Sequence, residues 1–182
     1  MSLKIQKEPK ILVGMHRRIE VWRPINKLTP AQMKDAKAFR IFGGVEKALI
    51  SVDERELDFE DLVVDNGLDA ACGALFDGSG NRPAVFNYVA IGTDDTSPSS
   101  SDTALGAEYM RVQGTYSKDA NTGECSMDAI FDIDATKALN ECGLFNASSG
   151  GTMYCRDTYT TKNVESGDTV KVYYTPKFQR PS

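Results

Sequence analysis

The sequence predicts a mostly β fold, an antiparallel β-sandwich with one or two short helices and an extended N-terminal arm. From residue 85 onward, runs of β-prone residues alternate with turn formers, which is typical of antiparallel sandwiches and barrels. Helix signals occur at two places, near residues 30–39 and 67–76. The first 28 residues have neither pattern, so we expect an arm over residues 1–28 and a body over residues 29–182.

The expected arm carries short apolar groups between charged residues. One stretch, Arg18 to Val21, alternates polar and apolar side chains and suits a short strand with one covered face. Trp22 is the only tryptophan, and its large apolar area favours a role as an anchor in the core or the arm. Because the segment has little to bury on its own, we expect it to become ordered only by docking on a neighbouring subunit.

Two short helices are predicted from their start signals. At the first, the hydroxyl of Thr29 can accept from the backbone N–H of Gln32 while the glutamine side chain returns a bond, and Pro30 fits the first helical position. The second has Asn66 as its expected cap and an apolar face at helical spacing that includes Leu75.

The body is predicted to consist mainly of strands. A hairpin is expected first, with strands Val45–Val52 and Leu57–Val64 around a charged turn. Residues 119–123 and 166–168 are rich in turn formers and are interpreted as further hairpin connections, whereas residues 135–139 have a helical pattern. The remaining strand candidates are Val85–Gly92, Glu108–Tyr116, Glu124–Asp132, Thr152–Thr160 and Thr169–Phe178.

The composition is that of an ordinary globular chain. Of its 182 residues, 41% are hydrophobic and 26% charged, and its longest apolar run, residues 70–76, is far shorter than the ~20 residues of a membrane-spanning helix. The net charge of −5 divides unevenly, because residues 1–47 carry an excess of seven positive charges and the remainder an excess of twelve negative ones. The basic residues are scattered and no aromatic stacking pattern accompanies them, so an acidic neighbouring subunit or the chain's own body is a better partner than nucleic acid.

No constellation for catalysis, cofactor binding or metal binding is predicted, and we expect no enzyme. His16 is the only histidine, and neither a nucleophile-elbow motif nor a phosphate-binding glycine loop is present. The four cysteines lack close pairs and are interpreted as reduced core residues, with disulfides between chains in an oxidising medium as the alternative. Two groups, Asp94-Asp95 with Asp102 and Asp132 with Asp134, could offer oxygen ligands to a hard cation, but turn formation explains them better.

Three stretches of the body form an ordered series of motifs. They are YVAIGTDDTSP at residues 88–98, SDTALGAEYMR at residues 101–111 and NECGLFN at residues 140–146. In order and spacing they resemble the IGTGTT-x-P, sDTaLg-x-E-x-x-R and EaGLFn motifs of structural proteins of tailed-phage virions, often described as tail or tail-fibre proteins. The resemblance extends over residues 62–178, about two thirds of the chain. Asp94-Asp95 stands where the family pattern has Gly-Thr.

The resemblance implies a structural protein of a phage virion, made in the host cytoplasm and assembled with other virion proteins as a homo-oligomer. A tail, neck or baseplate component and a capsid decoration (cement) protein both agree with it. The charged members of the motifs, Glu108, Arg111 and Glu141, are expected to form a structural polar cluster. An arginine that holds buried carboxylates satisfies groups whose burial otherwise costs several kcal/mol.

Two other classes of function are the alternatives. A receptor- or glycan-binding module on a phage tail appendage would be favoured if Tyr154, Tyr159, Tyr173 and Tyr174 lay together on a loop surface. Their alternate strand positions favour core and sheet-face roles instead. A hydrolase is the least supported class, because the only histidine lies in the basic arm.

Overall fold

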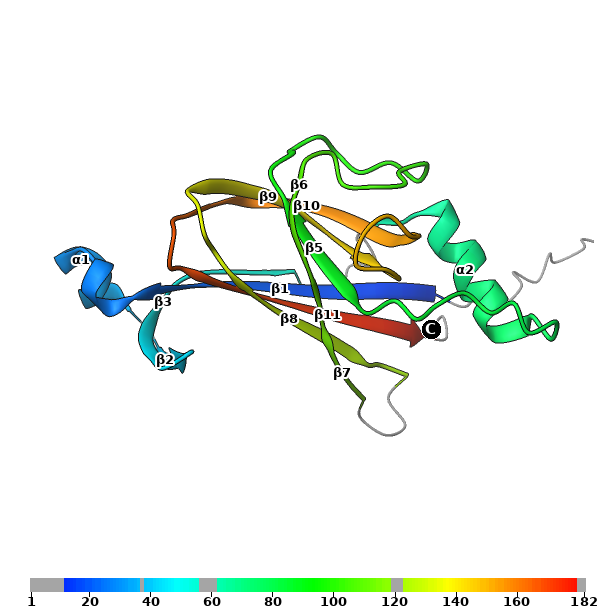
Figure 1. The fold of residues 1–182 in the computed structure, drawn as a ribbon, viewed down its shortest axis with the longest axis horizontal. Coiled ribbons are helices and arrows are strands. Elements are labelled where there is room, and N and C mark those ends of the chain that lie inside the picture. The colour runs from blue at the N-terminus through cyan, green and yellow to red at the C-terminus, as the bar shows by residue number, and fades with distance from the viewer. Residues whose placement is uncertain (1–11, 37, 56–61, 119–122, 180–182) are drawn as a thin grey trace, which may run out of the picture.

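The protein folds into two antiparallel β-sheets that pack on each other (Figure 1). The computed structural model describes residues 12–36, 38–55, 62–118 and 123–179. In spatial order, the first sheet consists of β2 (Phe39–Phe42), β3 (Val45–Arg55), β1 (Leu12–Pro24), β11 (Thr169–Gln179), β8 (Ser126–Asp132) and β7 (Thr115–Ser117). The second consists of β4 (Leu62–Val63), β10 (Met153–Val164), β9 (Lys137–Phe145), β5 (Tyr88–Gly92) and β6 (Glu108–Gln113). The helices are α1 (Pro30–Asp35), α2 (Asp65–Phe76) and a 3-10 turn at Ile25–Lys27.

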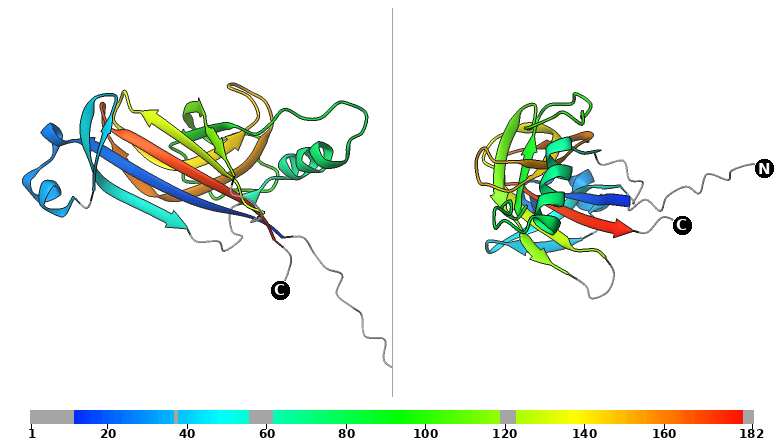
Figure 2. Two further views of the ribbon diagram at one scale, coloured as in Figure 1. Left: turned by 90° about the horizontal axis from the view of Figure 1, so that it is seen from below. Right: turned by 90° about the vertical axis from the view of Figure 1, so that its right-hand side faces the viewer.

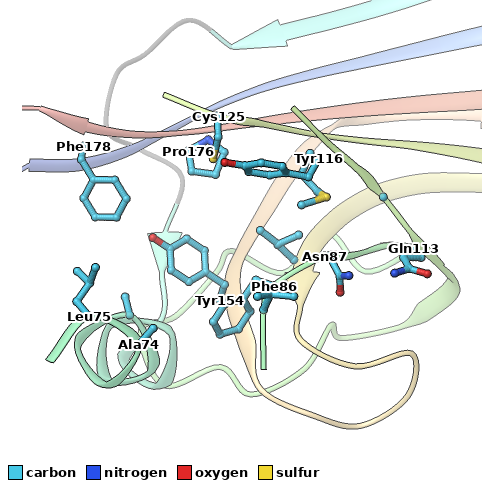
Figure 3. Close-up of a pocket in the computed structure, with 15 residues that line it drawn as sticks. Ala74, Leu75, Phe86, Asn87, Gln113, Tyr116, Cys125, Tyr154, Pro176 and Phe178 are labelled. Atoms are coloured by element: carbon cyan, nitrogen blue, oxygen red, sulfur yellow. The ribbon is translucent and has the colours of Figure 1, made fainter. Parts of the chain in front are cut away.

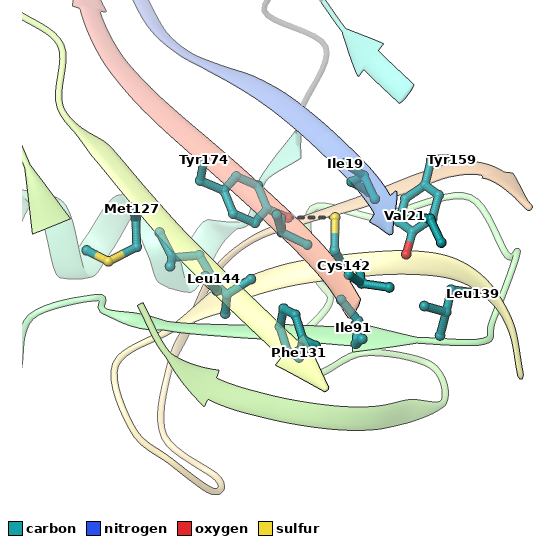
Figure 4. Packing of buried hydrophobic residues seen from close by; sticks show 14 of the residues in the cluster. Ile19, Val21, Ile91, Met127, Phe131, Leu139, Cys142, Leu144, Tyr159 and Tyr174 are labelled. Atoms are coloured by element: carbon teal, nitrogen blue, oxygen red, sulfur yellow. Dashed lines mark hydrogen bonds between the residues drawn. The ribbon is translucent and has the colours of Figure 1, made fainter. Parts of the chain in front are cut away.

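The core lies between the two sheets, as the predicted mostly β, sandwich-like fold requires (Figure 4). Along β8, the buried side chains of Met127, Ala129 and Phe131 alternate with more exposed ones, which is the two-residue period of a strand with one covered face. Across the core, Cys142 of β9 accepts a hydrogen bond from the hydroxyl of Tyr174 on β11 at 2.8 Å. The predicted fold class is therefore confirmed.

The arm prediction is wrong for residues 12–24. They form β1, which lies inside the first sheet between β3 and β11 (Figure 2). The register with β11 starts at Leu12 opposite Gln179, so the strand pairs with the other end of the chain. Ile19 is fully buried in the core by this pairing, which no local sequence pattern could reveal. Residues 1–11 of the predicted arm lie outside the described residues.

The first predicted helix is present but short. The hydroxyl of Thr29 accepts from the backbone N–H of Gln32 at 3.2 Å, and the side-chain oxygen of Gln32 accepts from the N–H of Thr29 at 3.0 Å. The expected capping box is therefore confirmed. The helix ends at Asp35 instead of near residue 39, because Phe39 already belongs to β2.

The second predicted helix is also confirmed, but its predicted cap is not. The helix begins before Asn66, and the residue at its N-cap is Val64, which makes no side-chain cap bond. The start is fixed by docking on β10: the N–H of Val64 donates to the carbonyl of Tyr154 at 3.0 Å. Gly67 lies against the backbone of Tyr154 with no room for a Cβ atom. Contact with a strand therefore positions this helix.

The hairpin predicted around Asp53 is wrong. β3 runs through that position without a turn, because it pairs along its length with β1. The hairpin lies earlier and joins β2 to β3 at Gly43–Gly44, whose φ angles of 55° and 80° suit glycine. Of the predicted strand Leu57–Val64, the described part is β4, which pairs with β10 in the other sheet, and residues 56–61 lie outside the described residues.

The helix predicted at residues 135–139 is also wrong, because β9 begins at Lys137. This strand pairs with β10 on one side and β5 on the other. Leu139 is fully buried in the core from this position. Pairing on both sides overrides the weak local preference of the segment for a helix.

One predicted hairpin turn is a connection between the sheets. Residues 166–168 join β10 of the second sheet to β11 of the first, so they cross the sandwich. Asp168 at this crossing is fully buried, and its carboxylate lies 2.7 Å from the guanidinium of Arg23 on β1. The other predicted turn, at residues 119–123, lies between β7 and β8, which pair antiparallel as a hairpin requires. Residues 119–122 themselves lie outside the described residues.

Candidate functional site

The motif segments found in the sequence meet at the carboxylate of Glu141 on β9. This side chain is fully buried. One of its oxygens accepts from the backbone N–H of Ala107 at 2.7 Å and from that of Asp94 at 3.3 Å, and the other accepts from the N–H of Gly106 at 2.9 Å. Glu141 thus fastens both ends of the long connection between β5 and β6, residues 93–107, to the second sheet.

Arg156 on β10 joins this cluster from the neighbouring strand. Its Nε donates to Glu141 at 2.9 Å, its Nη1 donates to Asp102 at 2.9 Å, and its Nη2 lies 3.8 Å from the carboxylate of Asp94. We call these four residues the motif cluster. The Arg156 side chain is only 4% exposed, so the carboxylates around it must offset the free-energy cost of burying its charge.

Asp94 and Asp102 also shape the connection that they belong to. Asp94 accepts from the backbone N–H of Thr96 at 2.7 Å, and Asp102 accepts from that of Ser99 at 2.9 Å. The bond from the Thr96 N–H lowers the pKa of the Asp94 carboxyl below its usual value. Both aspartates therefore act as the turn formers that the sequence predicts. Asp94 also adds one carboxylate to the surroundings of Arg156.

The motif glycines are explained by close packing around the same cluster. A Cβ atom at Gly92 would collide with the carboxylate of Glu141, and one at Gly106 would collide with the carboxylate of Asp94. At Gly143 a Cβ atom would lie 2.9 Å from the carbonyl oxygen of Cys155. The glycines of these motifs therefore permit strands and loop to approach closely around Glu141.

The predicted polar cluster of Glu108, Arg111 and Glu141 divides into two parts. Arg111 on β6 pairs with Glu108, with its Nε 3.0 Å from the carboxylate, and also donates to the carbonyls of Ala147 and Gly150 at 3.0 and 2.8 Å. Glu141 belongs to the motif cluster with Arg156. The register explains the division, because Glu108 and Glu141 lie opposite the same β5 residue from its two sides.

A second buried polar cluster links the two sheets and was not predicted. Arg17 on β1 is fully buried and lies 2.5 Å from Asp157 on β10 and 3.0 Å from Asp53 on β3. Lys162 lies 3.4 Å from Asp53, and the Arg17 guanidinium lies 5.0 Å from the ring centre of Tyr159. Sequence reasoning assigns Arg17 to an arm and Asp53 to a turn, so it could not bring them together.

An apolar groove opens at one end of the sandwich, between α2 and the first sheet (Figure 3). Its volume is about 750 Å³. The buried ring of Tyr154 lies among its lining residues, and burial raises the pKa of the Tyr154 hydroxyl to about 12. We call it the end groove. Its lining includes Leu75, Phe86, Tyr116, Tyr154, Pro176 and Phe178.

The tyrosines that would favour glycan binding do not gather on a loop surface. Tyr154, Tyr159 and Tyr174 are buried. Tyr173 is half-buried on β11, and its hydroxyl donates to Glu20 at 3.2 Å. These are the core and sheet-face positions expected from their alternation in sequence.

The cysteines only partly follow their predicted core role. Cys142 and Cys155 are buried, Cys125 is half-buried and Cys72 is exposed, and none of the four forms a disulfide within the chain. Cys72 lies on α2, on a face of this helix that is exposed. Burial raises the pKa of the Cys125 thiol, which makes it a poor nucleophile.

The remaining polar residues give no further constellation. His16 lies on β1 opposite Thr175. In the part of the chain that the structure describes, no three His, Cys, Asp or Glu side chains are grouped so that they could hold a metal ion. None of the helices in this part has the length and apolar character needed to cross a membrane.

Comparison with known proteins gives no relative: no protein-family model and no curated protein matches the chain.

Proposed function

We propose that the chain is a non-enzymatic structural component of a tailed-phage virion that assembles through contacts with other virion proteins. The motif cluster is the observation that carries the proposal. Glu141 is fully buried, and its carboxylate has Arg156 and three backbone N–H groups as donors. A carboxylate engaged in this way holds a loop in place and has no free position for a substrate.

The motif cluster also has a consequence for assembly. Residues 93–107 are bonded at both ends to Glu141 and near the middle, through Asp102, to Arg156. A connection held in this way loses little conformational entropy when a neighbouring protein binds to it. A surface of this kind suits a subunit that occupies a repeated, symmetric place on a particle. A tail, neck or baseplate component and a capsid decoration protein both meet this description.

The test is to find the chain in a particle. Virions of the phage that encodes the chain would be purified, the chain quantified by mass spectrometry, and a tagged copy located by electron microscopy. We expect a fixed copy number that matches a symmetric head or tail feature. A phage protein with no place in the particle, measured in the same fraction, controls for carry-over. Abundance in the lysate with absence from purified particles would refute the proposal.

A further inference from the structure

We draw no further inference here: the strongest candidate, the end groove between α2 and the first sheet, is an apolar surface, and nothing in the described part of the structure shows what covers it.

Discussion

Removing the carboxylate of Glu141 should destabilise the whole protein strongly. The variant Glu141→Ala deletes the acceptor of three backbone N–H groups and one partner of Arg156. Arg156 is almost fully buried and would keep the carboxylate of Asp102 as its close partner. Breaking a buried ion pair by removing one member costs about 3–5 kcal/mol.

The expected cost of about 3–5 kcal/mol takes into account that water can bond to some of the groups that lose Glu141. The N–H groups of Gly106 and Ala107 belong to residues that are themselves exposed, so solvent can replace part of what Glu141 provides. Counting each lost bond separately would give a larger loss and would overestimate the effect. A domain of this kind is stable by about 5–15 kcal/mol, so this loss would remove a large share of its free energy of unfolding.

Unfolding in urea measures the effect directly. Trp22 is the only tryptophan and is buried in the first sheet, so its fluorescence reports the global transition. Glu141→Gln keeps the shape and one acceptor oxygen, and should lie between the wild type and the alanine variant. Glu46→Ala, at an exposed position on β3, is the control and should change stability by less than about 0.5 kcal/mol.

A small loss of stability in Glu141→Ala would refute this reasoning. If Glu141→Ala costs less than about 1 kcal/mol, the motif cluster does not hold the connection between β5 and β6 in the way that we describe. Hydrogen exchange gives an independent check, since the amides of Gly106 and Ala107 should lose protection in the variant. Unchanged protection at both amides would contradict the same arrangement.

Three further results are expected. The pKa of the Tyr154 hydroxyl is raised from 10.0 in the unfolded chain to about 12 in the folded protein. The neutral hydroxyl therefore stabilises the fold fully below pH 10, and the free energy of unfolding falls by about 3 kcal/mol as the pH rises toward 12. Tyr154→Phe should reduce this alkaline loss in urea titrations, and the exposed Tyr116→Phe should not. Deleting residues 1–28 removes β1 and should abolish cooperative unfolding measured by circular dichroism, whereas a soluble, cooperatively folded product would contradict the register of β1 with β11. His16→Ala should leave incorporation into particles unchanged, and loss of a hydrolytic activity in this variant with the fold intact would contradict a non-enzymatic role.

The sequence predicts well those features that depend on neighbouring residues. The capping box of Thr29 and Gln32 is one example, and the alternation along β8 is another. The pair of Glu108 and Arg111, three residues apart, belongs to the same class. These features need no knowledge of what lies across the core, so composition and periodicity suffice to indicate them.

The missed features all depend on contacts between distant parts of the chain. The sequence predicts an arm in place of β1 because the partner strand β11 is at the opposite end of the chain. Arg17 and Asp157 are 140 positions apart, and Arg156 meets Glu141 only because β10 pairs with β9. One signal is present: Arg156 and Asp157 interrupt a run of β-prone residues between Met153 and Tyr159. Charges inside such a run indicate either a bulge at the surface or a buried pair.

The pairing of β1 with β11 determines when the chain can fold during its synthesis. Among the strands of the first sheet, β1 is made before all the others, and its neighbour β11 is made after them. A nascent chain that lacks residues 169–179 therefore cannot complete this sheet, however much of the second sheet has formed. Folds dominated by contacts between distant residues form slowly. We conclude that the first sheet closes only after residues 169–179 have been synthesised, so β1 lacks one of its two partners while all the strands between them are made.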